Sequence, residues 1–349
     1  MTPHFIINGL FYSQKTTGVH RFAREIILEL DKIIEADLCS IAIPKGVQVP
    51  NLSNIKFVEV GTHHGMLWEQ WDLPRFVKKQ KGTLISLCNS QPLLKPGIIC
   101  IHDAAYKTHP EYFKTFHGKM SVIWHRLVYR QATKWTNYPI LTVSYFSKYS
   151  LIDTYRINPS RITVVGNGWQ HLKAKQSDDC VLGKNGLQKD SFYFTLGNIN
   201  YNKNTRWVVE YAQKHPNETF VLSGVRVKNS SIDIDHTPNI KYLGFLSDEE
   251  IVSLYQNCKA FIFPSIHEGF GIPPMEALYF GAKIIISNTT CLPEIYQGSA
   301  HYIDAYSTDC NLNELITQYV NPPNQVLDRY GWDISAQKIK NIMLNMTNC

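Results

Sequence analysis

Two glutamates with seven residues between them, Glu268 and Glu276, are the first candidates for chemistry in this sequence. The surrounding stretch 260–287 predicts a short apolar strand, a loop with two glycines, a helix opened by two prolines, and a second apolar strand. Such a unit normally pairs two parallel strands through a right-handed crossover, and open α/β sheets bind ligands where the strands end. Glu268 is therefore predicted at the start of the loop and Glu276 in the first turn of the helix, beside a ligand site.

The loop and the helix start favour an anion, because the first N–H groups of a helix have no partner within it. The two carboxylates also offer acceptors for hydroxyl groups. A ligand that carries both phosphate and hydroxyls, such as a nucleotide sugar, matches this combination. In the structural alternative, Glu268 only caps the loop and Glu276 only complements the helix dipole.

The segment HEGFGIPPMEA, behind a predicted buried strand, resembles the E-x7-E signature of the family 4 (group 1) retaining glycosyltransferases, which have the GT-B fold. By this resemblance, Glu268 contacts hydroxyls of the donor sugar and takes part in the chemistry, while Glu276 contacts the ribose. The resemblance also implies that four further residues of the loop bind sugar and phosphate: Gly269, Phe270, Gly271 and Ile272.

Two segments of the first half resemble the same family. TTGVHRFAREI, at a predicted helix start, resembles its N-terminal glycine loop, which implies that Gly18 and Arg21 approach the donor phosphates and the acceptor. HDAAYKTHPEYF resembles its first-domain signature and implies that His102, at the end of a buried strand, is a catalytic residue near the donor sugar. Asp103 either orients His102 or caps the following turn. The structural alternatives are an ordinary loop glycine and a histidine bonded within the core.

GNINYNKN resembles the family's G-x-x-x-P-R-K-N segment, whose basic pair binds the diphosphate. Lys203 keeps the lysine position, whereas Tyr201 and Asn202 replace proline and arginine, and Asn198 stands where some relatives carry arginine. Part of the positive charge that binds the diphosphate is therefore missing, and Arg206 is a candidate to supply it. In the structural alternative, Lys203 is an ordinary surface lysine. A later turn resembles the part of the family that lies against the nucleobase, and its residues are Gly244, Phe245 and Leu246.

The length of 349 residues exceeds what one core usually supports and predicts two domains. The resemblance to the GT-B fold implies two Rossmann-like, doubly wound parallel-sheet domains that face a cleft. The predicted bounds are 1–170 for an acceptor-binding domain, 171–190 for a polar linker, 191–325 for a nucleotide-sugar-binding domain, and 326–349 for a helix that crosses back to the first domain.

Eight scattered cysteines without C-x-x-C or zinc-like spacing predict reduced thiols and no metal site. No apolar run approaches the roughly 18 residues of a membrane span, and the N-terminus lacks a basic region and a cleavage site, so a cytoplasmic protein is expected. No nucleic-acid-binding motif is present.

The basic residues are unevenly placed. Residues 1–165 hold 20 Lys and Arg against 11 Asp and Glu, a net charge of +9, whereas 166–349 hold 15 against 18, a net charge of −3. A basic half suits anionic lipid headgroups or an anionic acceptor, and ordinary solvated charge is the alternative. The stretch 114–134 interleaves aromatic and basic residues, which predicts peripheral contact with the cytoplasmic face of the inner membrane.

The prediction for function is a hexosyltransferase that transfers a hexose from a nucleotide diphospho-sugar to a lipid-linked oligosaccharide or other saccharide acceptor. The resemblance implies retention of anomeric configuration, no metal and no cofactor, and a role in bacterial surface polysaccharide synthesis, such as O-antigen or capsule; it slightly favours GDP-mannose. One alternative is a catalytically silent sugar-nucleotide-binding protein, since arginine positions are lost. Another is a glycoside hydrolase that uses the two glutamates.

Overall fold

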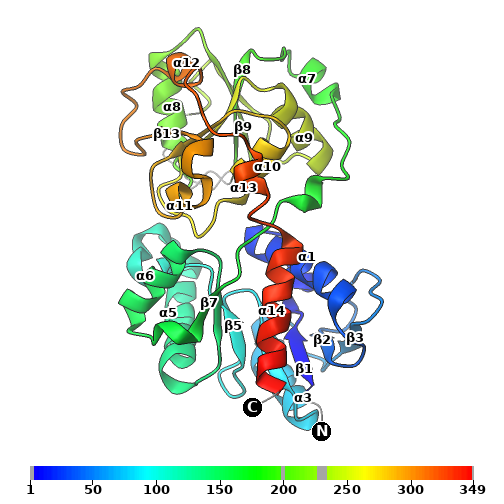
Figure 1. Cartoon of the computed structure of the whole chain (residues 1–349). Coiled ribbons are helices and arrows are strands. Elements are labelled where there is room, and N and C mark those ends of the chain that lie inside the picture. The colour runs from blue at the N-terminus through cyan, green and yellow to red at the C-terminus, as the bar shows by residue number, and fades with distance from the viewer. Residues whose placement is uncertain (1–3, 198–200, 226–233, 348–349) are drawn as a thin grey trace. The chain divides into compact units, whose positions relative to one another are not determined.

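The computed structural model describes residues 4–197, 201–225 and 234–347, and the chain forms two compact units (Figure 1). Unit 1 comprises Met1–Gly168 and Gly331–Cys349, and unit 2 comprises Trp169–Tyr330. Each unit has its own parallel β-sheet.

Unit 1 is built on seven parallel strands in the order β3-β2-β1-β4-β5-β6-β7. Their bounds are β1 (Phe5–Asn8), β2 (Cys39–Ile43), β3 (Lys56–Glu59), β4 (Thr83–Ser86), β5 (Ile98–Cys100), β6 (Ile140–Thr142) and β7 (Ile162–Val164). The chain order reverses between β1 and β4, and the carboxyl ends of two such strands mark the point where open α/β sheets bind ligands.

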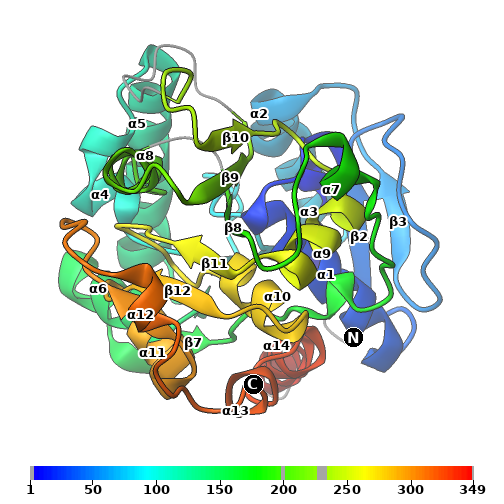
Figure 2. The same ribbon diagram turned by 90° about the horizontal axis from the view of Figure 1, so that it is seen from above.

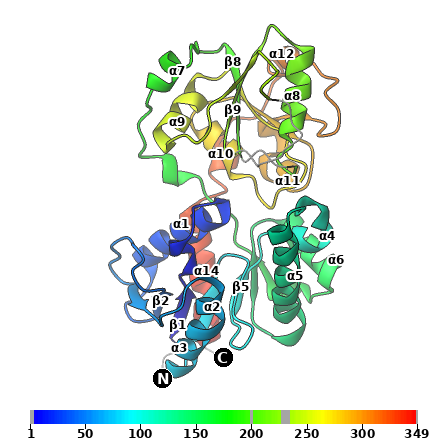
Figure 3. The ribbon, with the colours of Figure 1, turned by 180° about the vertical axis from the view of Figure 1, so that it is seen from behind.

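Helices cover both faces of this sheet. The α-helices of the described part of unit 1 are α1 (Gly18–Ile33), α2 (Gly65–Leu67), α3 (Leu73–Lys79), α4 (Ala105–Thr108), α5 (Phe116–Arg130), α6 (Tyr145–Tyr155) and α14 (Trp332–Thr347). A π-helical turn, η2 (Trp68–Asp72), lies between α2 and α3. In Figure 1, α1 and α14 lie side by side over one face, and Figure 3 shows α3 and α5 over the other. Five apolar residues of α1 recur every three or four positions and are buried, as the sequence pattern predicts: Phe22, Ala23, Ile26, Ile27 and Leu30.

Unit 2 has six parallel strands in the order β10-β9-β8-β11-β12-β13, most of which can be followed in Figure 2. Its strands are β8 (Phe192–Leu196), β9 (Thr219–Ser223), β10 (Ile240–Tyr242), β11 (Ala260–Phe263), β12 (Ile284–Ser287) and β13 (His301–Ile303). Its helices are α7 (Cys180–Lys184), α8 (Thr205–Lys214), α9 (Asp248–Asn257), α10 (Ile272–Tyr279), α11 (Leu292–Tyr296), α12 (Leu312–Leu315) and α13 (Asn324–Leu327).

The unit predicted from the glutamate motif is confirmed. Strand β11, helix α10 and strand β12 follow one another, and β11 and β12 pair in parallel with Phe261 opposite Ile284. Both strands are apolar at every position except Ser287, because helices cover both faces of a parallel sheet.

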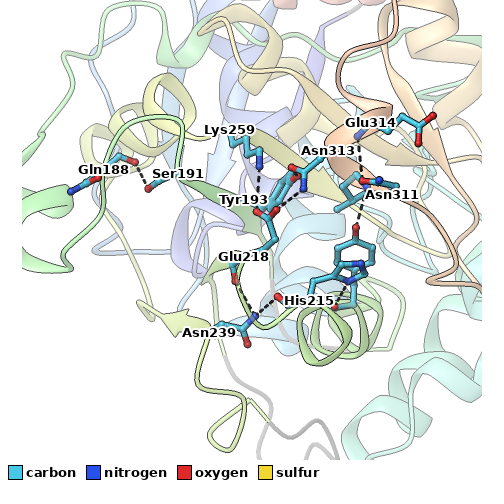
Figure 4. A network of polar contacts seen from close by, with 12 residues as sticks. Gln188, Ser191, Tyr193, His215, Glu218, Asn239, Lys259, Asn311, Asn313 and Glu314 are labelled. Carbon is cyan, nitrogen blue, oxygen red and sulfur yellow. Dashed lines mark hydrogen bonds and ion pairs between the residues drawn. The ribbon is translucent and has the colours of Figure 1, made fainter.

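A polar network fastens the amino ends of the unit 2 strands (Figure 4). The carboxylate of Glu218 accepts a hydrogen bond from Asn313 Nδ2 at 2.5 Å and pairs with Lys259 Nζ at 3.3 Å. The hydroxyl of Tyr193 donates to Asn313 Oδ1 at 3.0 Å. Tyr193, Glu218 and Lys259 stand at the beginning of β8, β9 and β11, so this network holds the edge of the sheet opposite to the carboxyl ends.

The segment 171–190 is not a linker, contrary to the sequence prediction, and belongs to unit 2. Lys175 Nζ pairs with Glu249 Oε1 at 2.8 Å, Ser253 Oγ donates to Asp179 Oδ1 at 2.6 Å, and α7 packs on α9. The segment lacks apolar periodicity because polar side chains and a single helical turn attach it. The C-terminal crossing also begins later than predicted, at Gly331, since α13 remains in unit 2.

No helix in the described parts of the chain is both long enough and apolar enough to span a membrane.

Candidate functional site

Lys203 and Glu268 meet beside the loop between β11 and α10. Lys203 Nζ lies 2.6 Å from Glu268 Oε1, and the two side chains are 26% and 10% exposed. The same ammonium lies 5.2 Å from the centre of the Phe263 ring. Two residues that the sequence predicts separately are therefore in contact, and their short charge-assisted bond is largely shielded from water.

Glu276 has different partners. One carboxylate oxygen lies 2.8 Å from His171 Nε2, and the other accepts a hydrogen bond from the Tyr255 hydroxyl at 2.9 Å. The side chains of His171 and Glu276 are only 2% and 8% exposed. Burial and the neighbouring carboxylate raise the pKa of Tyr255, so its hydroxyl stays protonated and donates. These contacts fix the orientation of the Glu276 carboxylate.

The position of Glu276 in the helix was predicted wrongly. Helix α10 begins at Ile272, so Glu276 is its fifth residue and lies beyond the first turn. The helix starts before the two prolines because the left-handed residue Gly271 caps it, and proline fits the first turn of a helix.

The loop is fixed by neighbouring segments. Asn204 adopts a left-handed conformation and its side-chain amide donates to the carbonyls of Pro264 and Ala305, at 3.0 and 2.8 Å. The backbone N–H of Ile266 donates to Asn202 O at 2.8 Å. The segment with Lys203 therefore holds the first half of the loop, which explains how the lysine reaches Glu268.

Steric constraints require a glycine at position 271. Its φ is +84°, and a Cβ there would lie 2.7 Å from Leu292 Cδ2, so any other residue would be strained. The hydroxyl of Tyr296 donates to the Gly271 carbonyl. The neighbouring Phe270 is 3% exposed and its ring packs edge-on against Tyr330, and Ile272 is 9% exposed. The side chains of Phe270 and Ile272 are therefore buried, and Gly269 is partly exposed.

The predicted nucleobase turn follows β10. Gly244, at φ +69°, accepts hydrogen bonds from Gly224 N and Ser223 Oγ at 2.8 and 2.9 Å. Phe245 is 87% exposed and Leu246 is buried. Within the described residues, no hydrogen bond or ion pair joins this turn to Lys203 or Glu268. Asn198, another predicted donor contact, lies outside the described residues.

His102, in unit 1, follows β5 and is 6% exposed. Its Nε2 lies 3.0 Å from the Leu87 carbonyl, so this nitrogen carries the hydrogen, and its ring packs edge-on against Phe22 at 4.8 Å. Burial lowers the pKa of His102 and favours the neutral ring. The Asp103 carboxylate accepts a hydrogen bond from Ala105 N at 2.8 Å, which matches the capping alternative.

Gly18 is the first residue of α1, and a Cβ there would meet nothing within 4 Å. The backbone N–H of Arg21 donates to Thr17 O at 2.8 Å, the first hydrogen bond of that helix. The residues on either side of Gly18, Thr17 and Val19, line a cavity in unit 1.

The sequence did not point to His171, Tyr255 or Asn204. His171 lies in the polar stretch interpreted as a linker, 105 positions before Glu276 in the sequence. Tyr255 belongs to the buried face of α9, where an aromatic residue has an ordinary packing role. Asn204 directly follows Lys203 in the segment GNINYNKN, and its place just before a predicted helix was the signal that could have indicated its capping position.

No cluster of three or more His, Cys, Asp or Glu side chains suited to a metal ion occurs among the described residues. The seven cysteines that the structure describes are free thiols.

Residues 182–325 match the family described as "Glycosyl transferases group 1". The chain is 28% identical over 230 residues to the O-antigen chain mannosyltransferase B of Escherichia coli, and the aligned region covers 62% of this chain and 59% of that protein. It is 23% identical over 262 residues to the O-antigen chain mannosyltransferase RfbU of Salmonella typhimurium, and the aligned region covers 72% of this chain and 70% of that protein.

Among solved structures, HepE of Anabaena in complex with UDP and glucose superposes with a TM-score of 0.70, at 14% identity, over 99% of this chain and 100% of that one. This likeness and the two sheets show the fold. Residues 182–325, most of unit 2, thus match the group 1 glycosyl transferases, within a chain that has the GT-B fold.

Proposed function

We propose that this protein is a mannosyltransferase that takes the sugar from GDP-mannose and builds a bacterial surface polysaccharide on a lipid-linked or saccharide acceptor. The observation that carries the proposal is the contact of Lys203 with Glu268 beside the α10 loop of a group 1 glycosyl transferase domain. The names of the two O-antigen relatives support mannose as the transferred sugar.

In the proposed reaction, Lys203 binds the diphosphate of the donor. Its side chain is 26% exposed, and in the proposed reaction phosphate oxygens of the donor replace the Glu268 carboxylate beside its ammonium. Together with the N–H groups at the start of α10, it stabilises the negative charge that develops on the departing diphosphate. No metal ion is needed for that task, and the proposed reaction is metal-independent and retaining.

Glu268 then accepts hydrogen bonds from hydroxyls of the donor sugar. Glu276, oriented by His171 and Tyr255, accepts them from the ribose. The loop amides of Gly269–Ile272, the turn with Phe245, and Gly18 with Arg21 are proposed to complete donor binding, and His102 is proposed to contact the sugar.

The experiment is a turnover assay of the purified chain with GDP-mannose and a lipid-linked oligosaccharide acceptor. Release of GDP together with a mannosylated acceptor supports the proposal. Tight binding of GDP-mannose without any turnover, with several acceptors, would identify the protein as a sugar-nucleotide-binding protein instead.

We also propose peripheral membrane contact through α5. Four apolar side chains recur along one side of this helix at helical spacing and are exposed: Phe116 (77%), Met120 (50%), Ile123 (61%) and Leu127 (38%). Exposed basic residues accompany them, namely Lys114, Lys119, Arg130 and Lys134. Val128 is buried in the core and Trp124 is partly buried, so those two side chains do not belong to this surface.

A further inference from the structure

A cavity of about 410 Å³ lies in unit 1 at the carboxyl ends of β1 and β4, where the strand order reverses. Asn8, the last residue of β1, and the residues directly after β4 line it, together with parts of α1, η2, α4 and α5. Its volume is within the range of about 300–1,000 Å³ that is usual for small-molecule sites. A cavity at this point of a doubly wound sheet is the expected place for a ligand.

A buried carboxylate, Glu69, lines this cavity and is only 3% exposed. Asn8 Nδ2 donates to its Oε1 at 2.8 Å, Ser90 Oγ donates to its Oε2 at 2.7 Å, and Gln70 Nε2 donates to Oε2 at 3.2 Å. Trp124 Nε1 donates in turn to Ser90 Oγ at 3.3 Å. The carboxylate is therefore held in one orientation from three sides.

The hydrogen bonds of Glu69 leave acceptor capacity. A carboxylate oxygen has two lone pairs, and within the described residues Oε1 accepts one hydrogen bond while Oε2 accepts two. Burial outweighs these donors and raises the pKa of Glu69. A ligand hydroxyl that donates to Oε1 would fill the remaining hydrogen-bond position of the Glu69 carboxylate, a group that is costly to bury without hydrogen-bond donors.

The chemistry of the lining favours a neutral ligand with hydroxyl groups. No lysine or arginine occurs among the described residues that line the cavity, so a phosphate there would face the Glu69 carboxylate without a counter-charge. Aromatic surface is present beside it: Trp124, and the Tyr106 ring stacked on His125 at 3.9 Å. Hydroxyl groups on one side and apolar C–H groups on the other are the surfaces of a pyranose ring.

We propose that this cavity binds one neutral hexose unit of the acceptor saccharide, and that Glu69 determines acceptor specificity by taking a hydrogen bond from one hydroxyl of that hexose. The proposal rests on the proposed function, because only a transferase has an acceptor, and it adds the place, the class of ligand and the residue. An acceptor that lacks the hydroxyl would leave one acceptor position of the buried Oε1 without a donor and would bind more weakly.

The test titrates the full chain with methyl α-D-mannopyranoside, a neutral hexoside, and follows binding by ligand-observed NMR. Glu69→Gln keeps the shape but loses the charge and one acceptor oxygen, and we expect it to bind the hexoside at least about tenfold more weakly. Gln14→Trp places a bulky ring at the exposed rim of the cavity and should weaken binding with an unchanged melting temperature. Glu111→Gln, an exposed glutamate outside the cavity, is the matched control and should bind as the wild type does.

Wild-type affinity in both Glu69→Gln and Gln14→Trp would overturn the hexose site, as would a wild-type chain that shows no saturable binding. If Glu69→Gln does not fold, Gln14→Trp alone decides. GDP binding is measured on the same samples and should be unchanged. Glu69-dependent hexoside binding without transfer to any acceptor would contradict the proposed function only, whereas transfer with an unchanged acceptor KM in Glu69→Gln would contradict the hexose site only.

Discussion

Glu268 and Glu276 lie on the two sides of one loop and have different surroundings. Glu268 pairs with a partly exposed lysine, whereas Glu276 is held between two buried side chains. Glu276→Ala should therefore raise the donor KM or abolish donor binding, and Glu268→Ala should mainly lower kcat. Steady-state kinetics with GDP-mannose separate the two effects. Glu210→Ala, which removes an exposed pair with Arg206 on α8, is the control, and wild-type kinetics in both site variants would refute the assignment.

His171 should act through Glu276. The pair at 2.8 Å is almost fully buried, so His171→Ala removes one of the two groups that orient the carboxylate. We expect a several-fold to tenfold higher donor KM with kcat nearly unchanged, the scale of losing one hydrogen bond to a charged group. His171→Gln, which keeps a donor, should recover part of the affinity. Equal losses in kcat and affinity would mean that His171 touches the reacting groups.

His102 offers a test with two readouts. If it contacts the donor sugar, His102→Gln should fold and lose about 10²-fold in kcat/KM. A large fall in melting temperature with unchanged turnover per folded molecule would make it a structural residue, as its bond to Leu87 and its packing on Phe22 also permit.

The contribution of His102 to the stability of the folded protein should depend on pH in a defined direction. Burial lowers its pKa in the folded state below 6.5, so the unfolded chain binds the proton first as the pH falls. Its contribution to stability is therefore present above about pH 6.5 and is lost below it. The difference in unfolding free energy between wild type and His102→Gln should be larger at pH 7.5 than at pH 5.5. A difference that grows toward acid pH would contradict a buried neutral histidine.

At the scale of elements, sequence patterns predicted the unit β11-α10-β12 because strand apolarity, two glycines and two prolines are local signals. The same patterns missed the attachment of 171–190 to unit 2, because polar contacts such as that of Lys175 with Glu249 join residues far apart in the sequence. They also placed Glu276 one residue too early in the helix, since the cap at Gly271 depends on a backbone conformation that composition does not reveal.

Helix α5 carries the prediction for membrane contact. Its exposed apolar residues should enter the lipid interface, and each nearby basic residue should contribute about 1 kcal/mol on an anionic surface. The wild type should co-sediment with vesicles that contain phosphatidylglycerol and dissociate in high salt. Phe116→Ser with Ile123→Ser should reduce binding, while Tyr319→Ser, an 85% exposed residue of unit 2, should not. Equal recovery in the supernatant with and without vesicles would rule out this surface.

At the scale of the whole molecule, the two sheets and the family match of residues 182–325 account for the fold, while the reaction itself rests on the proposed donor contacts. The basic pair expected at the diphosphate is reduced to Lys203, with Arg206 engaged by Glu210 in the described structure. In the proposed mechanism Lys203 therefore supplies most of the positive charge that stabilises the departing diphosphate. Its loss should lower turnover more than the loss of Arg206 does.

The most direct measurement is the rate of GDP release and acceptor mannosylation from GDP-mannose by wild type, Lys203→Ala and Arg206→Ala, each with EDTA present. The proposed mechanism predicts turnover by the wild type in EDTA, an α-linked product that retains the donor configuration, a loss of about 10²-fold or more in Lys203→Ala, and little change in Arg206→Ala. A reaction that stops in EDTA and resumes with Mg²⁺ or Mn²⁺, or one that proceeds unchanged in Lys203→Ala, would contradict it.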